Sequence, residues 1–232
     1  KISHIDKMSE QELRSKIISL TDTEARQERL VNELIAHMID LDIERFEQVL
    51  DNYVVMHGID RAITQIIFPF LHRIGILWIT NHIQPAQEHL VSNIIRQKLV
   101  VGIEGAMPIR QVQRTILLFL PEGEYHELGL LYVHYLLRSH GSRVLYLGCD
   151  MPLKDVEFVS KYKQPDFLYT HLTGIAGNFN LERFISEVSR RIPDIPLVIS
   201  GQLARVHSKK VPPGVNFKRS LSEVLEFVAS IG

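Results

Sequence analysis

The chain has 232 residues, of which 45% are hydrophobic and 23% charged, and its formal net charge is −1. This length and composition are typical of a globular protein with room for two small domains. The near-neutral charge argues against a nucleic-acid-binding surface on this chain.

Cysteine usage and hydropathy indicate where the protein works. Cys149 is the single cysteine, which excludes an intrachain disulfide and fits a reducing compartment. The apolar runs are too short to span a bilayer, and the first residues lack a secretory signal. We therefore expect a cytoplasmic protein that does not enter membranes.

The first half of the chain predicts helices. Apolar residues recur at helical spacing, and residues that favour helix starts precede each run. The expected helices begin at Ser9, at Thr21 or Thr23, at Asp42, near Ile59 and near Pro85. Five helices with short connections describe a helical bundle over residues 9–107.

The pattern changes after residue 107. Short apolar runs typical of buried strands alternate with helical segments, which indicates a parallel sheet covered on both faces. The expected strands are 115–120, 144–147, 167–170 and 197–200, and the expected helices are 124–139, 153–161, 181–192 and 221–231. Residues 112–232 therefore predict a flavodoxin-like or Rossmann-like domain.

Three loops of this domain are expected to form one rim. Ligands of open parallel sheets bind beyond the carboxyl ends of the strands, where the strand order reverses. In a flavodoxin-like order the first, third and fourth strands are neighbours, and the loops that follow them are 121–129, 170–174 and 200–202. Their glycines and small hydroxyl residues suit a ligand that lies close against the backbone.

His126 is the candidate metal ligand of this rim. An exposed imidazole can offer a nitrogen to a metal, and a carboxylate two residues away, Glu124, can fix its tautomer and raise its basicity. A lone histidine here is more often an ordinary residue of a helix's first turn. Gly129 favours a ligand, because a glycine three residues later lets the backbone pass close to a bulky group.

These residues belong to three ordered motifs, namely Glu124-Tyr125-His126-Glu127-Leu128-Gly129, Thr170-His171-Leu172 and Ser200-Gly201. The set resembles the corrinoid-binding pattern Asp-x-His-x-x-Gly, Ser-x-Leu and Gly-Gly. In that family the histidine replaces the benzimidazole of cobalamin as the lower cobalt ligand, and the displaced nucleotide tail enters the α/β domain. The resemblance implies His126 as the cobalt ligand. With the rim, it implies these cofactor-binding residues: Glu124, Gly129, Thr170, Leu172, Gly174, Ser200 and Gly201.

Two residues of the rim bear on function in other ways. Ser200 stands where the corrinoid-binding pattern has its first glycine, which places a side chain where the nucleotide tail should pass. His171 lies on the same rim, where it could touch the cofactor.

The helical half carries a second motif, in which nine residues separate Trp78 from Glu88-His89. A break at 80–84 predicts a helical hairpin, so that the end of one helix meets the start of the next. The motif is similar to the Trp-x9-Glu-His motif of cobalamin-dependent, light-sensing transcriptional regulators of the MerR type. In that family the tryptophan covers the adenosyl group, and the Glu-His pair helps to hold the upper axial side.

The resemblance covers nearly the whole chain from about residue 10. It implies that Trp78, Glu88 and His89 bind cofactor, that the cofactor is adenosylcobalamin, and that the chain is a sensor and not an enzyme. Cofactor binding would control homo-oligomerisation, as a dimer or tetramer, and DNA binding through a domain absent from this chain, with residues 1–8 as the linker. Family members carry a histidine directly after the tryptophan, where this chain has Ile79, so the light response is the weaker implication.

Two other functions fit the same fold. A corrinoid carrier for methyl transfer would share the bundle, the α/β domain and His126, but it gives no reason for the Trp78 motif. A cobalamin-free regulatory module would fit the departures at Ile79 and Ser200.

Overall fold

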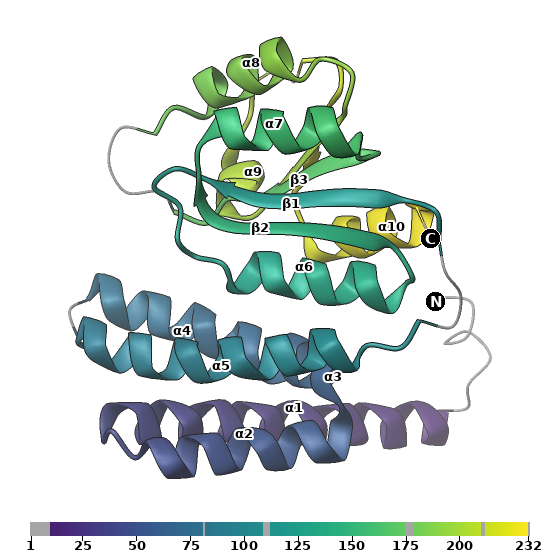
Figure 1. The fold of residues 1–232 in the computed structure, drawn as a ribbon. Helices are drawn as coiled ribbons and strands as arrows, with labels where there is room; N and C mark the ends of the chain where they lie inside the picture. Colours follow the sequence, from purple (N-terminus) through teal and green to yellow (C-terminus); the bar gives the residue numbers. More distant parts are fainter. Residues whose placement is uncertain (1–9, 81, 109–111, 175–178, 210–211, 232) are drawn as a thin grey trace. The chain divides into compact units, whose positions relative to one another are not determined.

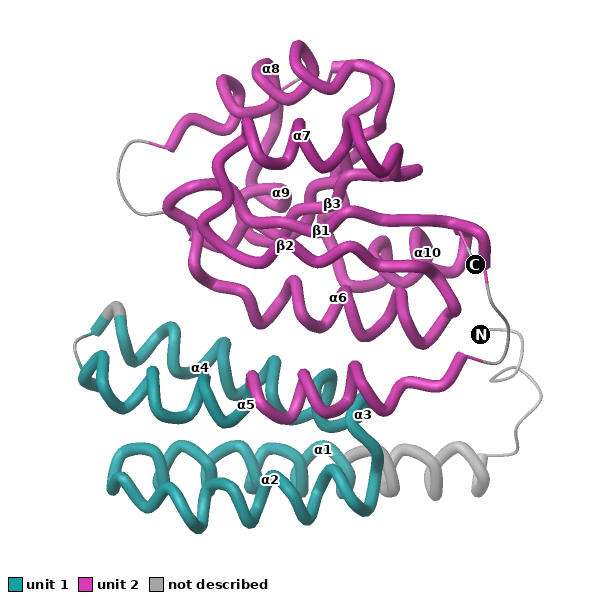
Figure 2. Tube along the Cα trace, in the orientation of Figure 1, with its two compact units in different colours: residues 1–95 teal, residues 96–232 magenta. Residues whose placement is uncertain are grey.

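The computed structural model describes residues 10–80, 82–108, 112–174, 179–209 and 212–231 (Figure 1). The chain divides into two compact units, residues 1–95 and residues 96–232 (Figure 2). The division falls inside one long helix, α5 (Pro85–Gly105). The predicted linker at 1–8 and the predicted cap at Ser9 lie outside the described residues.

The first unit is built from helices. Its core includes an aromatic pair, Phe46 and Phe70, whose ring centroids lie 5.4 Å apart. A π-helical turn at Ile63–Ile67 joins α3 to α4, so these elements form one continuous helical run. The helices besides α5 are α1 (Glu10–Ile39), α2 (Ile43–His57), α3 (Ile59–Ala62) and α4 (Phe68–Ile79).

The predicted break at Thr21 or Thr23 is wrong, because α1 is one helix of 30 residues. Threonine and aspartate favour helix caps, but inside a helix they cost only about 0.7 kcal/mol each at most. No glycine or proline lies between residues 10 and 39, so nothing interrupts the backbone ladder. The start of α2 matches its prediction, since the Asp42 side chain accepts a hydrogen bond from the backbone N–H of Arg45 at 3.2 Å.

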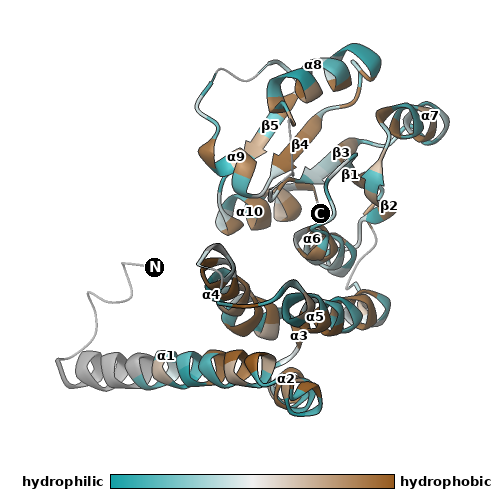
Figure 3. Ribbon diagram, turned by 90° about the vertical axis from the view of Figure 1, so that its left-hand side faces the viewer, coloured by the Kyte–Doolittle hydropathy of each residue, from teal (hydrophilic) through white to brown (hydrophobic). Residues whose placement is uncertain are grey.

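The second unit contains a parallel sheet of five strands in the order β2-β1-β3-β4-β5. Helices α7 and α8 lie on one face, and α6 and α10 on the other (Figures 1 and 3). The order is flavodoxin-like, so the predicted fold class is confirmed, and β1, β3 and β4 are neighbours as expected. The strands are β1 (Thr115–Pro121), β2 (Arg143–Met151), β3 (Phe167–His171), β4 (Leu197–Ser200) and β5 (Val215–Lys218). The helices are α6 (Leu128–Ser139), α7 (Leu153–Lys163), α8 (Leu181–Arg191), α9 (Gln202–Val206) and α10 (Leu221–Ile231).

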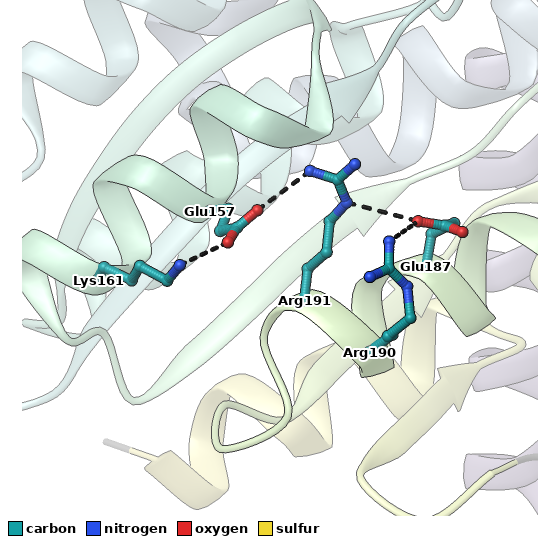
Figure 4. Close-up of polar contacts among 5 residues, drawn as sticks. All are labelled: Glu157, Lys161, Glu187, Arg190 and Arg191. Atoms are coloured by element: carbon teal, nitrogen blue, oxygen red, sulfur yellow. Dashed lines mark hydrogen bonds and ion pairs between the residues drawn. The ribbon is translucent and has the colours of Figure 1, made fainter.

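Apolar packing and a surface ion network hold α7 and α8 on their face of the sheet. Val156 from α7 and Phe184 from α8 join the core cluster beneath them. Above this core, Glu157 pairs with Lys161 at 2.5 Å and with Arg191 at 3.1 Å, so it links the two helices (Figure 4). Exposed pairs of this kind stabilise a fold little, so the apolar core carries most of the packing energy.

Two short elements escaped prediction. β5 and α9 have four and five residues, too few for a periodic pattern to emerge. The other departures are element ends that differ by a few residues, apart from the start of α6.

Within the ranges that the structure describes, no helix is both long and apolar enough to cross a membrane.

Candidate functional site

The loop between β1 and α6 carries the predicted metal ligand. A helix was predicted from Glu124, but α6 begins at Leu128. The backbone explains the difference. Gly123 has a left-handed φ of 83°, and the carbonyl oxygen of Glu124 accepts from the Asp150 N–H in β2 at 3.2 Å. Glu124 and His126 therefore lie in a loop tied to the sheet, ahead of the helix.

The central interaction of this loop joins Glu124 to His126. The Nδ1 of His126 donates to Oε1 of Glu124 at 2.6 Å, and the backbone N–H of His126 donates to the same oxygen at 3.0 Å. The His126 side chain is 63% exposed, whereas that of Glu124 is fully buried. A proton held on Nδ1 leaves the lone pair of the neutral imidazole on Nε2, the nitrogen that a metal would use.

Glu124 stays ionised despite its burial. Burial by itself raises the pKa of Glu124, but hydrogen bonds from the side chain and backbone of His126, with help from the backbone N–H of Thr173, outweigh it. The pKa of Glu124 therefore lies below its usual value. A buried carboxylate increases the basicity of the imidazole that it binds.

The same carboxylate joins the first loop of the rim to the second. Oε2 of Glu124 accepts from the backbone N–H groups of Thr173 at 3.0 Å and Gly174 at 3.2 Å, which follow β3. A Cβ added at Gly174 would meet no atom within 4 Å among the described residues, so they leave room beside this glycine. The structure thus brings together the loops after β1 and β3, as the strand order predicts.

Gly129 packs against the histidine of the second motif. A Cβ on Gly129 would lie 2.3 Å from Nε2 of His171, which is shorter than any normal non-bonded contact of a Cβ atom. The imidazole of His171 fills the space that the missing side chain leaves. In this structure Gly129 is thus required for packing α6 against β3. The bulky group that the sequence predicts beside this glycine is the His171 side chain.

Ser200 is directed into a buried hydrogen-bond chain. Its Oγ accepts from the hydroxyl of Tyr169 at 2.8 Å and lies 2.8 Å from Nδ1 of His171. The serine hydroxyl can donate to Nδ1, which places the imidazole proton on Nε2. The side chain that stands for the first glycine of the corrinoid pattern is only 1% exposed and is held by these two partners.

The remaining residues of the second and third motifs are tightly packed or buried. Gly201 has a left-handed φ of 94°, and a Cβ there would lie 2.4 Å from the carbonyl oxygen of Leu172. Leu172 and Thr170 are fully buried. Oγ1 of Thr170 has no hydrogen-bond partner among the residues that the structure describes, which is unusual for a buried hydroxyl.

The tryptophan motif lies in the first unit. α4 and the part of α5 within the first unit run side by side as the predicted helical hairpin, and residue 81 between them lies outside the described residues (Figures 1 and 3). Trp78 is 45% exposed near the end of α4. In the first turn of α5, Nδ1 of His89 lies 3.5 Å from Oε2 of Glu88. The large exposed indole and the Glu-His pair belong to this hairpin, whereas the other candidate residues belong to the second unit.

Sequence reasoning missed several residues that support the loop. Asp150 has a left-handed φ of 56° and accepts from the Gly123 N–H at 2.9 Å. Glu127 pairs with Arg96 and accepts from Tyr146 at 2.9 Å. Glu127 directly follows His126, but no periodic pattern or motif in the sequence links Glu127 to Arg96 or Tyr146. No group of three or more His, Cys, Asp and Glu in the described ranges is arranged to hold a metal ion.

Comparison with known proteins identifies the class of domain. Residues 30–101 match the family model described as a B12 binding domain. The chain is 30% identical over 167 residues to the HTH-type transcriptional repressor CarH of Myxococcus xanthus, covering 72% of this chain and 55% of that protein. It is 26% identical over 199 residues to CarA, a repressor of the same type and organism, covering 85% of this chain and 67% of that protein.

The chain therefore contains a cobalamin-binding domain and is homologous to these two repressors, which confirms the resemblance found in the motifs. It spans about half the length of CarH and two thirds of CarA. The fold is also that of a solved structure, the Methanosarcina barkeri monomethylamine corrinoid protein. The TM-score is 0.64 at 12% identity, with 88% of this chain and 99% of that chain covered.

The residues on the rim fit a corrinoid. An exposed imidazole is oriented by a buried carboxylate, the described residues leave room beside Gly174, and Thr170 offers a buried hydroxyl that needs a partner. His126 would hold the cobalt, while the rim backbone would approach the rest of the group. Bound cobalamin would supply a redox-active cobalt centre at this site.

Replacing Gly129 by alanine should destabilise the second unit by about 1–3 kcal/mol, because the new methyl group overlaps the His171 ring. Urea denaturation followed by circular dichroism measures this loss. Gly75→Ala is the matched control, since a Cβ at that helical position meets nothing within 4 Å and should be neutral or slightly stabilising. A Gly129→Ala/His171→Ala double variant as unstable as the sum of the single variants would contradict the assigned contact.

The stability of the second unit should depend on pH through His171. Burial lowers the pKa of His171 from 6.5 to about 4, against the opposing charge of Glu124. Between these two pH values His171 is protonated in the unfolded chain but neutral in the folded chain. The free energy of unfolding therefore decreases as the pH falls from 6.5 towards 4. At pH 5 the loss should be about 2 kcal/mol.

Comparing the wild type with His171→Gln by urea denaturation at several pH values isolates this contribution. His134 in α6 also has a pKa lowered to about 4, chiefly by burial, and it affects both proteins alike. The variant should lose stability less steeply between pH 6.5 and 5. Parallel curves for the two proteins would rule out a neutral, buried His171.

Proposed function

We propose that this chain is the cofactor-binding sensor region of a transcriptional regulator, and that His126 is the lower axial ligand of a bound cobalamin. The hydrogen bond from Nδ1 of His126 to the buried, ionised Glu124 carries the proposal. This pair directs the imidazole lone pair to Nε2 and increases its basicity, which is what a cobalt ligand requires. The chain's homology to two HTH-type repressors supports the regulatory role.

Electron paramagnetic resonance of the Co(II) ion can test ligation by His126. Protein labelled with ¹⁵N-histidine and loaded with cobalamin in the Co(II) state should give an electron paramagnetic resonance spectrum split into doublets. Ligation by the cofactor's own benzimidazole, with ordinary nitrogen, gives triplets. His126→Ala should lose the doublets, whereas His89→Ala should keep them.

Triplets in the labelled wild-type protein would exclude histidine ligation. Failure of cobalamin to co-elute with the protein on gel filtration would exclude the proposed function as a whole.

We further propose that adenosylcobalamin is the cofactor in use, and that its binding controls homo-oligomerisation and, through it, DNA binding by the whole regulator. Trp78, Glu88 and His89 would contact the adenosyl side. The aromatic area of the exposed Trp78 and the neighbouring Glu88-His89 pair support this assignment. In this role the chain is a sensor and catalyses no reaction of its own.

Assembly should respond to cofactor and to light. Light scattering after gel filtration in the dark should show a larger particle with adenosylcobalamin than without it, because the ligand stabilises the state that it binds. Green light should reverse the change, and His126→Ala should abolish it. A mass independent of adenosylcobalamin would exclude ligand-linked assembly. A mass that is unchanged by light would remove the light response and leave a cobalamin sensor.

A second candidate function is corrinoid carriage for methyl transfer. It is favoured by the shared fold with the monomethylamine corrinoid protein. A carrier would exchange methyl groups with a partner methyltransferase and would show no dependence of assembly on the adenosyl group. The assembly experiment therefore separates the two functions.

A further inference from the structure

A second carboxylate, Glu127, directly follows the proposed cobalt ligand, and both of its oxygens are used. Oε1 pairs with Nε of Arg96, in the part of α5 that belongs to the second unit. Oε2 accepts from the hydroxyl of Tyr146 in β2 at 2.9 Å. The side chain is 15% exposed. Glu127, Arg96 and Tyr146 together are called the Glu127 clasp below.

The clasp is built from groups that hold their protonation states. Burial, followed by the charge of Glu127, raises the pKa of Tyr146 well above its ordinary value, so its hydroxyl keeps the proton that it donates. The Tyr146 ring stacks on His134 of α6, with centroids 5.2 Å apart and planes 17° apart. The acceptor, the donor and the packing around them are therefore fixed together.

Glu127 also marks the point where the loop becomes a helix. Its carbonyl oxygen accepts from the Leu131 N–H at 2.8 Å, which closes the first turn of α6. The backbone of His126 thus lies between two anchored carboxylates. Glu124 binds the imidazole ring, and Glu127, the residue after His126, is bound to Tyr146 of β2 and to Arg96 of the same unit. These anchors restrain different parts of the ligand, the ring and the main chain.

We propose that Glu127, through Arg96 and Tyr146, is a positioning residue that holds the His126 loop where the imidazole can reach cobalt. The inference rests on the proposed function, because it takes His126 as the ligand. A metal ligand must be held within about 0.5 Å of its productive position, and outer groups that orient it commonly change metal affinity 10–100-fold. Nothing in the clasp touches the cofactor in this proposal, so its effect passes through the position of the His126 main chain.

Glu127→Gln tests the clasp. Glutamine keeps the size and an acceptor for Tyr146 but loses the charge that binds Arg96. Loaded with cobalamin in the Co(II) state and labelled with ¹⁵N-histidine, the variant should show a mixture of doublets and triplets, with cobalamin affinity lowered about 10-fold. Arg96→Gln should give the same mixture, and the double variant should be no worse than either single change.

Glu157→Gln is the matched control. It also removes a carboxylate charge paired with an arginine, Arg191, but it lies on α7 (Figure 4). It should keep the pure doublet spectrum and the wild-type affinity. Circular dichroism of each cobalamin-free variant measures folding separately, and if Glu127→Gln does not fold, Arg96→Gln carries the same test.

The outcomes are distinct. Pure doublets and unchanged affinity in both Glu127→Gln and Arg96→Gln would overturn the positioning role while leaving His126 as the ligand. Equal losses in Glu157→Gln would overturn it too, since the effect would then be general. Absence of doublets in the wild type would exclude histidine ligation itself, and the clasp would then have no cobalt ligand to position.

Discussion

The buried carboxylate of Glu124 is the interaction on which the candidate site depends. One side chain binds the His126 imidazole, the His126 backbone and two N–H groups of the loop after β3. Burying a charge is costly unless hydrogen bonds compensate, and here four donors do so. The same contacts that keep the group ionised also set the tautomer of His126 and close the rim between two strands. Stability and ligand geometry thus rest on a single anion.

Around this anion, close packing and a buried hydrogen-bond chain complete the site. Gly129 and Gly201 let α6 and the β4 end approach the end of β3, and His171 fills the space beside Gly129. Ser200, which departs from the corrinoid pattern, joins Tyr169 and His171 in a buried chain. The departure is therefore satisfied inside the protein.

Much of this could be predicted from the sequence, for physical reasons. Buried strands and amphipathic helices leave periodic patterns, and their alternation predicts a parallel sheet, although it leaves open whether the strand order is Rossmann-like or flavodoxin-like. The rim residues of the first two loops were found because neighbouring parallel strands end at one edge.

The Glu127 clasp could not be predicted, because Arg96, Glu127 and Tyr146 meet only in the folded unit. The start of α6 was misplaced because the hydrogen bond from Asp150 to the Glu124 carbonyl is a tertiary contact. The roles assigned to the site residues remain predictions.

β2 is a nine-residue strand at one end of the sheet order, and its only strand partner among the described residues is β1. Long, regular strand edges invite pairing with other molecules and hence aggregation. Gly148 and Asp150 have φ angles of 86° and 56°, and the register with β1 shifts there. Such a bulged edge is a poor template for a foreign strand. The irregularity that aims Asp150 at the His126 loop therefore also protects the protein from self-association through its sheet.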